Sequence, residues 1–385
     1  MSGPDSAAGR GVPLKEVALL FLRLGTTAFG GPAAHVAMME HEMVRRRRWV
    51  SRERFLDLLG ATNLIPGPNS TELAIYLGHL ASGWVGLVVA GLCFIVPASL
   101  LTLALAWAYV QFGARPQAEA LLYGVKPVII AVVVQALWGL GRTALKTIPL
   151  GVLAAVALAA AAGGTSPLVV LVAAGAGAVL IRSVAAPAGP LRFWSNGIAP
   201  IAAGAASVAP FSLTGLFLFF VKVGAILYGS GYVLLAFLRA DLVDRWHWLT
   251  DRQLLDAVAV GQITPGPVFT TATFVGYLLG GISGATVATV AIFLPSFVFV
   301  AISGPLVPRL RRAPSAGAFL DGVNVGALAL MANVTFALTR AAIIDLPTVL
   351  LATVSAILLL RWRVNSAWLV LGGALAGAVV SGAIG

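Results

Sequence analysis

Long apolar stretches recur along nearly the whole chain, and they constrain its fold more than any other feature. A helix of about 20 apolar residues spans the hydrocarbon core of a bilayer. Of the 385 residues, 59% are hydrophobic and only 10% are charged, whereas soluble proteins carry about 25% charged residues. The sequence therefore predicts an all-α polytopic membrane protein, and it excludes a soluble enzyme, a disordered chain and a nucleic-acid binder.

The apolar stretches divide into candidate spans and two interrupted segments. The candidate spans lie near 14–39, 82–112, 118–140, 147–162, 166–182, 211–238, 281–306, 316–338, 346–360 and 366–384. The interrupted segments, 55–80 and 254–279, each contain polar residues and a Pro-Gly-Pro motif. These motifs mark places where a regular helix cannot continue.

The two parts of the chain repeat one another. Matches at an offset of 199 residues, and of 198 beyond a one-residue gap, stay in register through many Gly, Pro and Trp residues. The matches include Gly25/Gly224, Arg46/Arg245, Trp49/Trp248, the Pro-Gly-Pro motifs at 66–68 and 265–267, Gly78/Gly276, Gly86/Gly284, Pro97/Pro295 and Gly124/Gly322. We predict a first repeat over 12–184, a linker over 185–210 and a second repeat over 211–385.

The orientation of the two repeats depends on the Pro-Gly-Pro segments. If these segments re-enter the membrane, each half has about five spans and the halves are inverted; if they cross it, each half has six and the halves are parallel. The Lys and Arg residues divide between the two sides equally well under both arrangements. The loop over 40–57 holds six arginines and four acids, whereas its counterpart over 239–256 holds three arginines and four aspartates. This opposite sign favours inverted repeats, each with a re-entrant Pro-Gly-Pro element.

The Pro-Gly-Pro motifs are the strongest candidates for a substrate site. Each motif interrupts a helix, and in the first half the polar residues 69–71 that follow Pro68 are typical of a new helix start. Free backbone N–H groups at a positive helix terminus suit an anion. The alternative is a pair of kinked helices that only pack together. The candidate substrate-binding residues are Asn63, Pro66, Gly67, Pro68, Asn69, Ser70 and Thr71 in the first half, and Gln262, Pro265, Gly266, Pro267 and Thr270 in the second.

A second pair of breaks and two cations add candidates. The segment 26–32 in the first half, which contains Gly30 and Gly31, corresponds to the segment 225–231 in the second, which contains Tyr228 and Gly229. In both segments the backbone could approach a ligand or another helix. Arg23 and Lys222 occupy equivalent positions inside the first predicted span of each half. An intramembrane cation indicates function by default, so we predict that both bind the anion; the alternative is that they reach the interface.

Glu72 follows the first Pro-Gly-Pro motif, and its counterpart in the second half is Thr271. A buried carboxylate can bind and release protons, so Glu72 is a candidate for coupling transport to protons; it could also neutralise Arg23 or cap the helix. The four histidines lack metal-ligand spacing, and the single Cys93 cannot form an intrachain disulfide. We expect no cofactor and no metal.

Several motifs together resemble the chromate ion transporter family in its long-chain, two-domain form. They are Phe29-Gly30-Gly31-Pro32, the basic loop ending in Trp49-Val50, and the Pro-Gly-Pro motif followed by Tyr76-Leu77-Gly78, with second copies at 228–232, 248–250 and 264–267. The resemblance covers about 14–384. It implies export of chromate across the bacterial inner membrane, chromate resistance, sulfate as a similar anion, and oppositely oriented halves.

Energetics independently favour efflux over uptake. A dianion that leaves a cell with a negative interior gains about 2.3 kcal/mol per charge per 100 mV, and the chain has no GxxxxGK[ST] motif for ATP. The sequence therefore predicts a secondary transporter, with proton or counter-anion coupling and a homodimer both compatible. Three alternatives remain: a transporter of another oxyanion or an organic anion, an anion channel, and a membrane-embedded enzyme.

Overall fold

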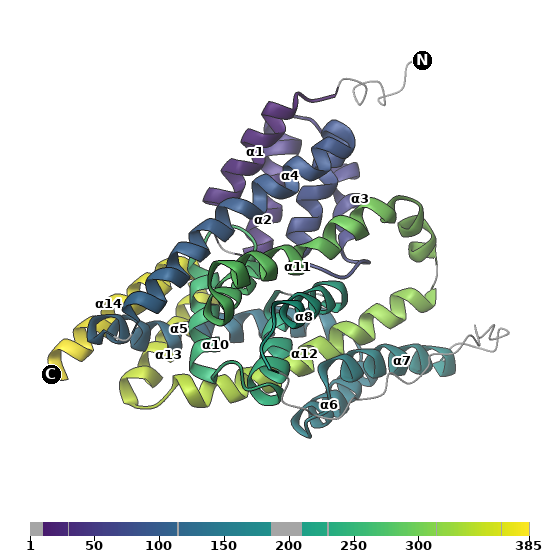
Figure 1. Cartoon of the computed structure of the whole chain (residues 1–385). Helices are drawn as coiled ribbons and strands as arrows, with labels where there is room; N and C mark the ends of the chain where they lie inside the picture. Colours follow the sequence, from purple (N-terminus) through teal and green to yellow (C-terminus); the bar gives the residue numbers. More distant parts are fainter. Residues whose placement is uncertain are drawn as a thin grey trace, which may run out of the picture.

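The computed structural model describes residues 11–384 apart from 30, 114, 186–209, 229–230, 313 and 363, and every regular element in this part of the chain is helical (Figure 1). The first half contains α1 (Leu14–Thr27), α2 (Gly31–Glu40), the π-helix η2 (His41–Arg46), α3 (Arg52–Thr62), α4 (Asn69–Phe112), α5 (Pro116–Ala144), α6 (Ile148–Ala162) and α7 (Pro167–Ala185). The second contains α8 (Leu213–Ile226), η3 (Gly231–Val233), α9 (Leu234–Phe237), η4 (Leu238–Arg245), α10 (Asp251–Ile263), η5 (Val268–Thr270), α11 (Thr271–Arg312), α12 (Pro314–Ala342), α13 (Leu346–Trp362) and α14 (Ser366–Ile384). The same order of elements occurs twice.

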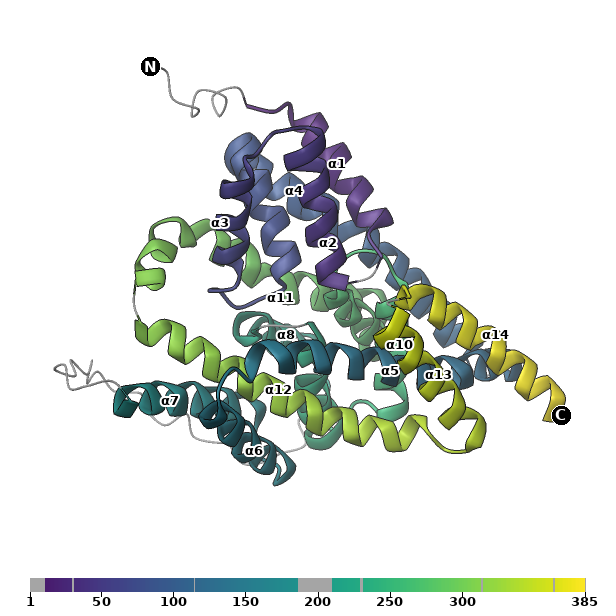
Figure 2. The same ribbon diagram turned by 180° about the vertical axis from the view of Figure 1, so that it is seen from behind.

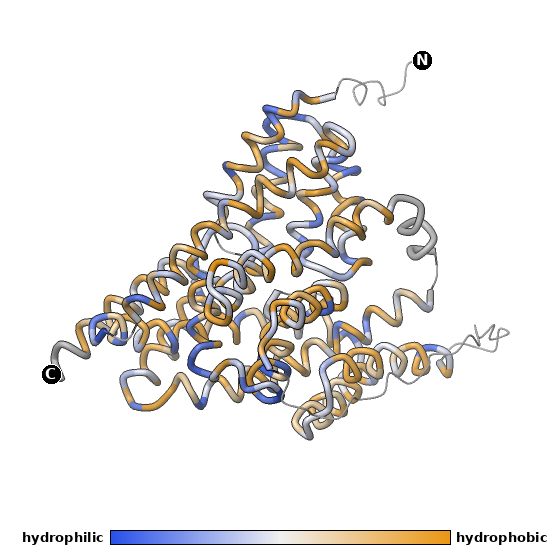
Figure 3. The backbone as a smooth tube through the Cα atoms, in the orientation of Figure 1, coloured by the Kyte–Doolittle hydropathy of each residue, from blue (hydrophilic) through white to orange (hydrophobic). Residues whose placement is uncertain are grey.

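The prediction of a multi-pass membrane protein is confirmed. Among the described residues, 5 helices are long and apolar enough to cross a membrane: α4, α5, α7, most of α12, and the segment Val268–Ser303 that contains most of α11. Four shorter apolar helices, α6, α8, α13 and most of α14, accompany them. Large hydrophobic side chains such as Trp138 are exposed on these helices, and Figure 3 shows hydrophobic residues along most of their length. An apolar surface of this kind suits contact with lipid.

The predicted single span over 14–39 is wrong, because the chain reverses there. Helix α1 ends at Thr27, and α2 starts at Gly31, whose φ of +76° favours glycine. Arg23 lies 3.5 Å from Glu42, and Arg47 lies 3.7 Å from Glu16, so α1 runs antiparallel to α2 and η2. The segment 211–238 divides in the same way, into α8 and the group of η3, α9 and η4.

Helices α4 and α11 are each two helical arms joined by a sharp bend. In α4 the bend lies at Ser82 and Gly83, and Gly83 has a φ of +62°. A Cβ on Gly78 would overlap Gly86 and Ala90, which shows that the first arm (69–81) folds back along the second (84–112). The bend in α11 at Gly280 and Gly281 is its counterpart.

Glycines allow close helix packing in both halves. Gly25 of α1 lies against the carbonyls of Cys93 and Phe94, and its counterpart Gly224 lies against Ile292. Helix α5 packs on α14 at Gly124, and α12 packs on α7 at Gly322. Small residues let the backbones approach closely, as in other membrane helix pairs. In both ribbon views α6 and α7 lie on the opposite flank from α13 and α14 (Figures 1 and 2).

Candidate substrate site

The two Pro-Gly-Pro turns contact the breaks of the opposite half through matching hydrogen bonds. The backbone N–H of Gly67 donates to the carbonyl of Leu227 at 2.7 Å, and that of Gly266 donates to the carbonyl of Ala28 at 2.9 Å. Leu227 and Ala28 are themselves counterparts under the repeat. Each turn is therefore fixed against the break that follows the first helix of the other half.

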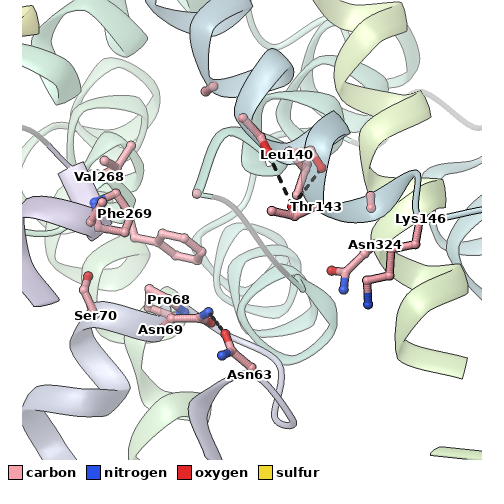
Figure 4. A pocket seen from close by; sticks show the side chains of 16 residues that line it. Asn63, Pro68, Asn69, Ser70, Leu140, Thr143, Lys146, Val268, Phe269 and Asn324 are labelled. Atoms are coloured by element: carbon pink, nitrogen blue, oxygen red, sulfur yellow. Dashed lines mark hydrogen bonds between the residues drawn. The ribbon is translucent and has the colours of Figure 1, made fainter. Parts of the chain in front are cut away.

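A cavity of about 520 Å³ opens beside these turns (Figure 4). The first half supplies polar side chains from its turn and from the start of α4, and the second half supplies mainly apolar ones. Figure 4 shows Lys146 and Asn324 side by side, across from the turn residues. The lining includes Asn63, Pro68, Asn69, Ser70, Thr143, Lys146, Gly231, Val268, Phe269 and Asn324.

The polar side of the cavity can donate several hydrogen bonds. The Asn69 side chain donates to the side-chain oxygen of Asn63 at 2.7 Å, which leaves the remaining amide hydrogens of both residues available. Helix α4 begins at Asn69, so the first backbone N–H groups have no intrahelical acceptor. Lys146 adds a cation, which is paired with Asp321 at 2.7 Å. Donors and a helix N-terminus in one place suit an anion.

A second cavity of about 680 Å³ shares Ala33 and Gly139 with the first. It is lined by Gln135, Arg142 and Asn365, among others. Arg142 forms no ion pair with any residue that the structure describes. A positive charge on the wall of the second cavity favours anions there.

His35 is a site residue that sequence reasoning missed. Its side chain is buried, with Nδ1 lying 3.2 Å from Ser70 Oγ and Nε2 lying 3.1 Å from the Ala28 carbonyl oxygen. Because a carbonyl only accepts, Nε2 carries a proton and donates to Ala28. His35 thus joins the break after α1 to a residue that lines the cavity. Its counterpart in the second half is Leu234. This difference between the two repeats could have indicated His35 as a site residue from the sequence.

Arg23 and Lys222 have acidic partners instead of contacts with the turns. Arg23 lies 3.5 Å from Glu42, and Lys222 lies 2.5 Å from Asp241. Glu42 and Asp241 are counterparts under the repeat, so the two halves contain the same ion pair. The Arg23 and Lys222 side chains are 60% and 39% exposed, and neither lines the two cavities.

Glu72 is fully buried directly behind the first turn. A Cβ on Gly67 would overlap its carboxylate, and within the described residues neither oxygen has a hydrogen-bond partner. Its ion pair with Arg23, one sequence alternative, does not form, because Arg23 pairs with Glu42.

The remaining predicted residues surround the turns or lie outside the described part. Thr71, Gln262 and Thr270 are buried near the turns, and Tyr228 follows the Leu227 carbonyl that accepts from Gly67. Pro66, Pro265 and Pro267 lie within the turns, and Gly31 starts α2. The predicted residues Gly30 and Gly229 lie outside the described residues.

A buried ion pair between the halves was not predicted. Asp256 is fully buried in α10, with Lys126 Nζ at 3.3 Å and the Tyr109 hydroxyl donating to it at 2.9 Å. The Lys126 side chain thus compensates the charge of an acid from the other half.

Apolar helices, paired broken helices and a cavity beside the breaks are typical of a multi-pass membrane transport protein. The model of the chromate transporter family matches residues 15–180 and again 214–378. The chain belongs to the chromate transporter family, as its motifs predicted, and the two matches support two halves.

Three curated relatives agree with this assignment. The chain is 35% identical to a chromate transport protein of Cupriavidus metallidurans, over 98% of this chain and 97% of the relative. It is 32% identical to a probable chromate transport protein of Synechococcus elongatus, over 91% of both chains. A chromate transport protein of Pseudomonas aeruginosa is 36% identical, over 83% of this chain and 80% of the relative. No solved structure matches the chain.

Proposed function

We propose that the protein is a secondary transporter that exports chromate across the inner (plasma) membrane and so confers chromate resistance. The observation that carries the proposal is the cavity beside the two Pro-Gly-Pro turns, with hydrogen-bond donors on one wall. Membership of the chromate transporter family supports chromate as the substrate. Sulfate, a tetrahedral dianion of similar shape, is included as a second substrate.

The oxyanion binds at the start of α4 in this proposal. Asn63, Asn69 and Ser70 supply side-chain donors, and the first turn of the helix supplies backbone N–H groups. Their counterparts Gln262, Val268 and Phe269 make the second turn much less polar at the cavity. We therefore propose one anion site per chain, with the second turn closing it from the other side.

Arg23 and Lys222 lie outside this proposed site. Their equivalent ion pairs fasten α1 to η2 and α8 to η4, which stabilises the hairpins whose ends contact the turns. In this proposal Arg142 and Lys146, and not Arg23 and Lys222, attract the anion. Lys146 lines the first cavity and Arg142 lines the second, and the anion passes through both.

One contact between the halves and the short helices α3 and α10 support inverted repeats over 12–184 and 211–385 joined by 185–210. Phe297 lies against Gly91, although the counterpart of Gly91 is Thr289, eight residues earlier. If the second arms of α4 and α11 ran parallel about a twofold axis, Gly91 would lie level with its counterpart Thr289. The residue that it contacts, Phe297, is instead eight residues further along, which corresponds to about 12 Å of helix. An antiparallel crossing of the second arms of α4 and α11 removes this discrepancy. The short helices before each Pro-Gly-Pro turn, α3 and α10, support re-entrant elements.

Alternating access follows from movement of one half against the other about these turns. Outward movement of a dianion from a cell at −100 mV gains about 4.6 kcal/mol, so export proceeds without ATP.

The proposal is tested by replacing the donors on the cavity wall. Asn69→Ala combined with Ser70→Ala should lower chromate accumulation by everted membrane vesicles by at least about tenfold, since two hydrogen bonds to a charged ligand are lost. Thr286→Ala is the matched control, because this exposed threonine bonds only within α11. Wild-type accumulation by the double variant would contradict the site, and no accumulation by the unmodified protein would contradict chromate transport.

A further inference from the structure

Glu72 occupies a closed polar site that the anion cavity does not include. The Glu72 and Ser296 side chains are both fully buried beside Gly67: a Cβ on Gly67 would overlap the Glu72 carboxylate and lie 3.0 Å from Ser296 Oγ. Within the described residues, neither carboxylate oxygen nor the Ser296 hydroxyl has a hydrogen-bond partner. An acid of α4 and a hydroxyl of α11 thus lie next to the same point of the first Pro-Gly-Pro turn.

The groups that face Glu72 cannot neutralise a negative charge. Two tyrosines, Tyr76 on the same arm of α4 and Tyr228 from the second half, are the titratable groups that interact with it electrostatically. His35, on α2, is already bonded to Ser70 and Ala28. No described Lys or Arg forms an ion pair with Glu72. An ionised carboxylate in such surroundings is strongly unfavourable, whereas the protonated acid is not.

The duplication shows that this site is not required for packing the turn. At the equivalent place in the second half, Thr271 stands for Glu72 and Ala98 stands for Ser296. Ala98 lies against Gly266 there, and the Thr271 hydroxyl donates to the Val268 carbonyl at 2.8 Å. The backbone contacts of the two turns are the same, but the acid and the hydroxyl occur together in one half only.

We propose that Glu72, with Ser296, forms a single buried proton-binding site beneath the first Pro-Gly-Pro turn, and that the proton and the oxyanion favour each other's binding. This inference rests on the proposed function, since it concerns the same turn. Ser70 lines the anion cavity and Glu72 is two residues further along α4. A negative charge on Glu72 repels an incoming dianion through a low-dielectric interior, and a proton on Glu72 removes that repulsion. Binding of the two ions is therefore reciprocal.

The test is the pH dependence of chromate transport by the purified full-length protein in liposomes. The chromate concentration for half-maximal transport should rise by up to tenfold per pH unit in the wild type once Glu72 ionises. Glu72→Gln should keep the low-pH value throughout, and Thr271→Val, at the equivalent position, should follow the wild type. Chromate takes up a proton itself, but that equilibrium is common to all three proteins, so the ratio of wild type to Glu72→Gln is the measured quantity.

A constant ratio across pH would overturn the proton site while leaving chromate transport intact. Absence of chromate transport by the wild type would overturn the proposed function and this inference with it. Ser296→Ala provides a second variant if Glu72→Gln does not reach the membrane. Loss of the hydroxyl makes the surroundings of the acid more apolar, so the pH midpoint should move upward by at least half a unit; an unchanged profile would overturn the proposal.

Discussion

Replacement of Gly67 by alanine tests how the first Pro-Gly-Pro turn works. Gly67 has a φ of +135° and donates to the Leu227 carbonyl at 2.7 Å. An alanine in such a conformation carries about 1–3 kcal/mol of backbone strain. Its Cβ would also overlap the Glu72 carboxylate and crowd Ser296, so the turn must move away from one of its partners.

Gly83→Ala is the matched control for strain alone. Gly83 has a φ of +62°, but a Cβ there would meet no atom within 4 Å. Its strain is about 1–3 kcal/mol, comparable to that at Gly67, and it lies at the bend of α4, away from the two cavities.

The assay is chromate accumulation by everted vesicles, normalised to the amount of protein in the membrane. Since 1.4 kcal/mol corresponds to a factor of ten, Gly67→Ala should transport at least about tenfold more slowly than the wild type. Gly83→Ala should retain more than about half of the wild-type rate. Equal rates for the two variants would refute the argument that contacts of the turn, and not glycine strain alone, set transport.

Three further predictions concern residues that support the site. His35→Leu, which introduces the residue of the second half, should lower chromate transport about tenfold, since Ser70 Oγ and a buried carbonyl lose a partner; wild-type vesicle transport would contradict this role. Lys126→Met should destabilise the protein by about 3–5 kcal/mol because it leaves the Asp256 charge without its cation, and adding Asp256→Asn should recover most of that loss. Thermal unfolding in detergent measures both variants. Equal unfolding temperatures for the single and double variants would disprove the pairing. Arg23→Gln breaks a largely exposed ion pair, so it should change the free energy of unfolding by less than about 1 kcal/mol and keep transport above half of the wild-type rate. Complete loss of efflux would indicate that Arg23 binds the substrate.

The sequence was sufficient to predict the features that depend on composition and on the repeat. Hydropathy located the helices, and the bends at Gly83 and Gly281 fall at the predicted starts of spans 82–112 and 281–306. The Pro-Gly-Pro motifs marked the turns that meet at the cavity. These features are local, because proline and glycine interrupt a helix wherever they occur.

The sequence was insufficient where a long-range contact decides the role of a residue. An apolar stretch such as 14–39 has the same hydropathy whether it crosses once or reverses, so the hairpin of α1 and α2 was missed. Without that hairpin, the partnership of Arg23 with Glu42, 19 residues away, could not be predicted. The roles of Lys126 and His35 could not be predicted for the same reason: their partners Asp256 and Ser70 are distant in the chain.

The most direct test of chromate export is flux through the purified protein in liposomes with an imposed membrane potential. The account predicts saturable chromate movement toward the positive side, accelerated by the potential and strongly reduced in the Asn69→Ala, Ser70→Ala double variant. Chromate flux that is absent, or that is the same in the double variant and the wild type, would contradict it.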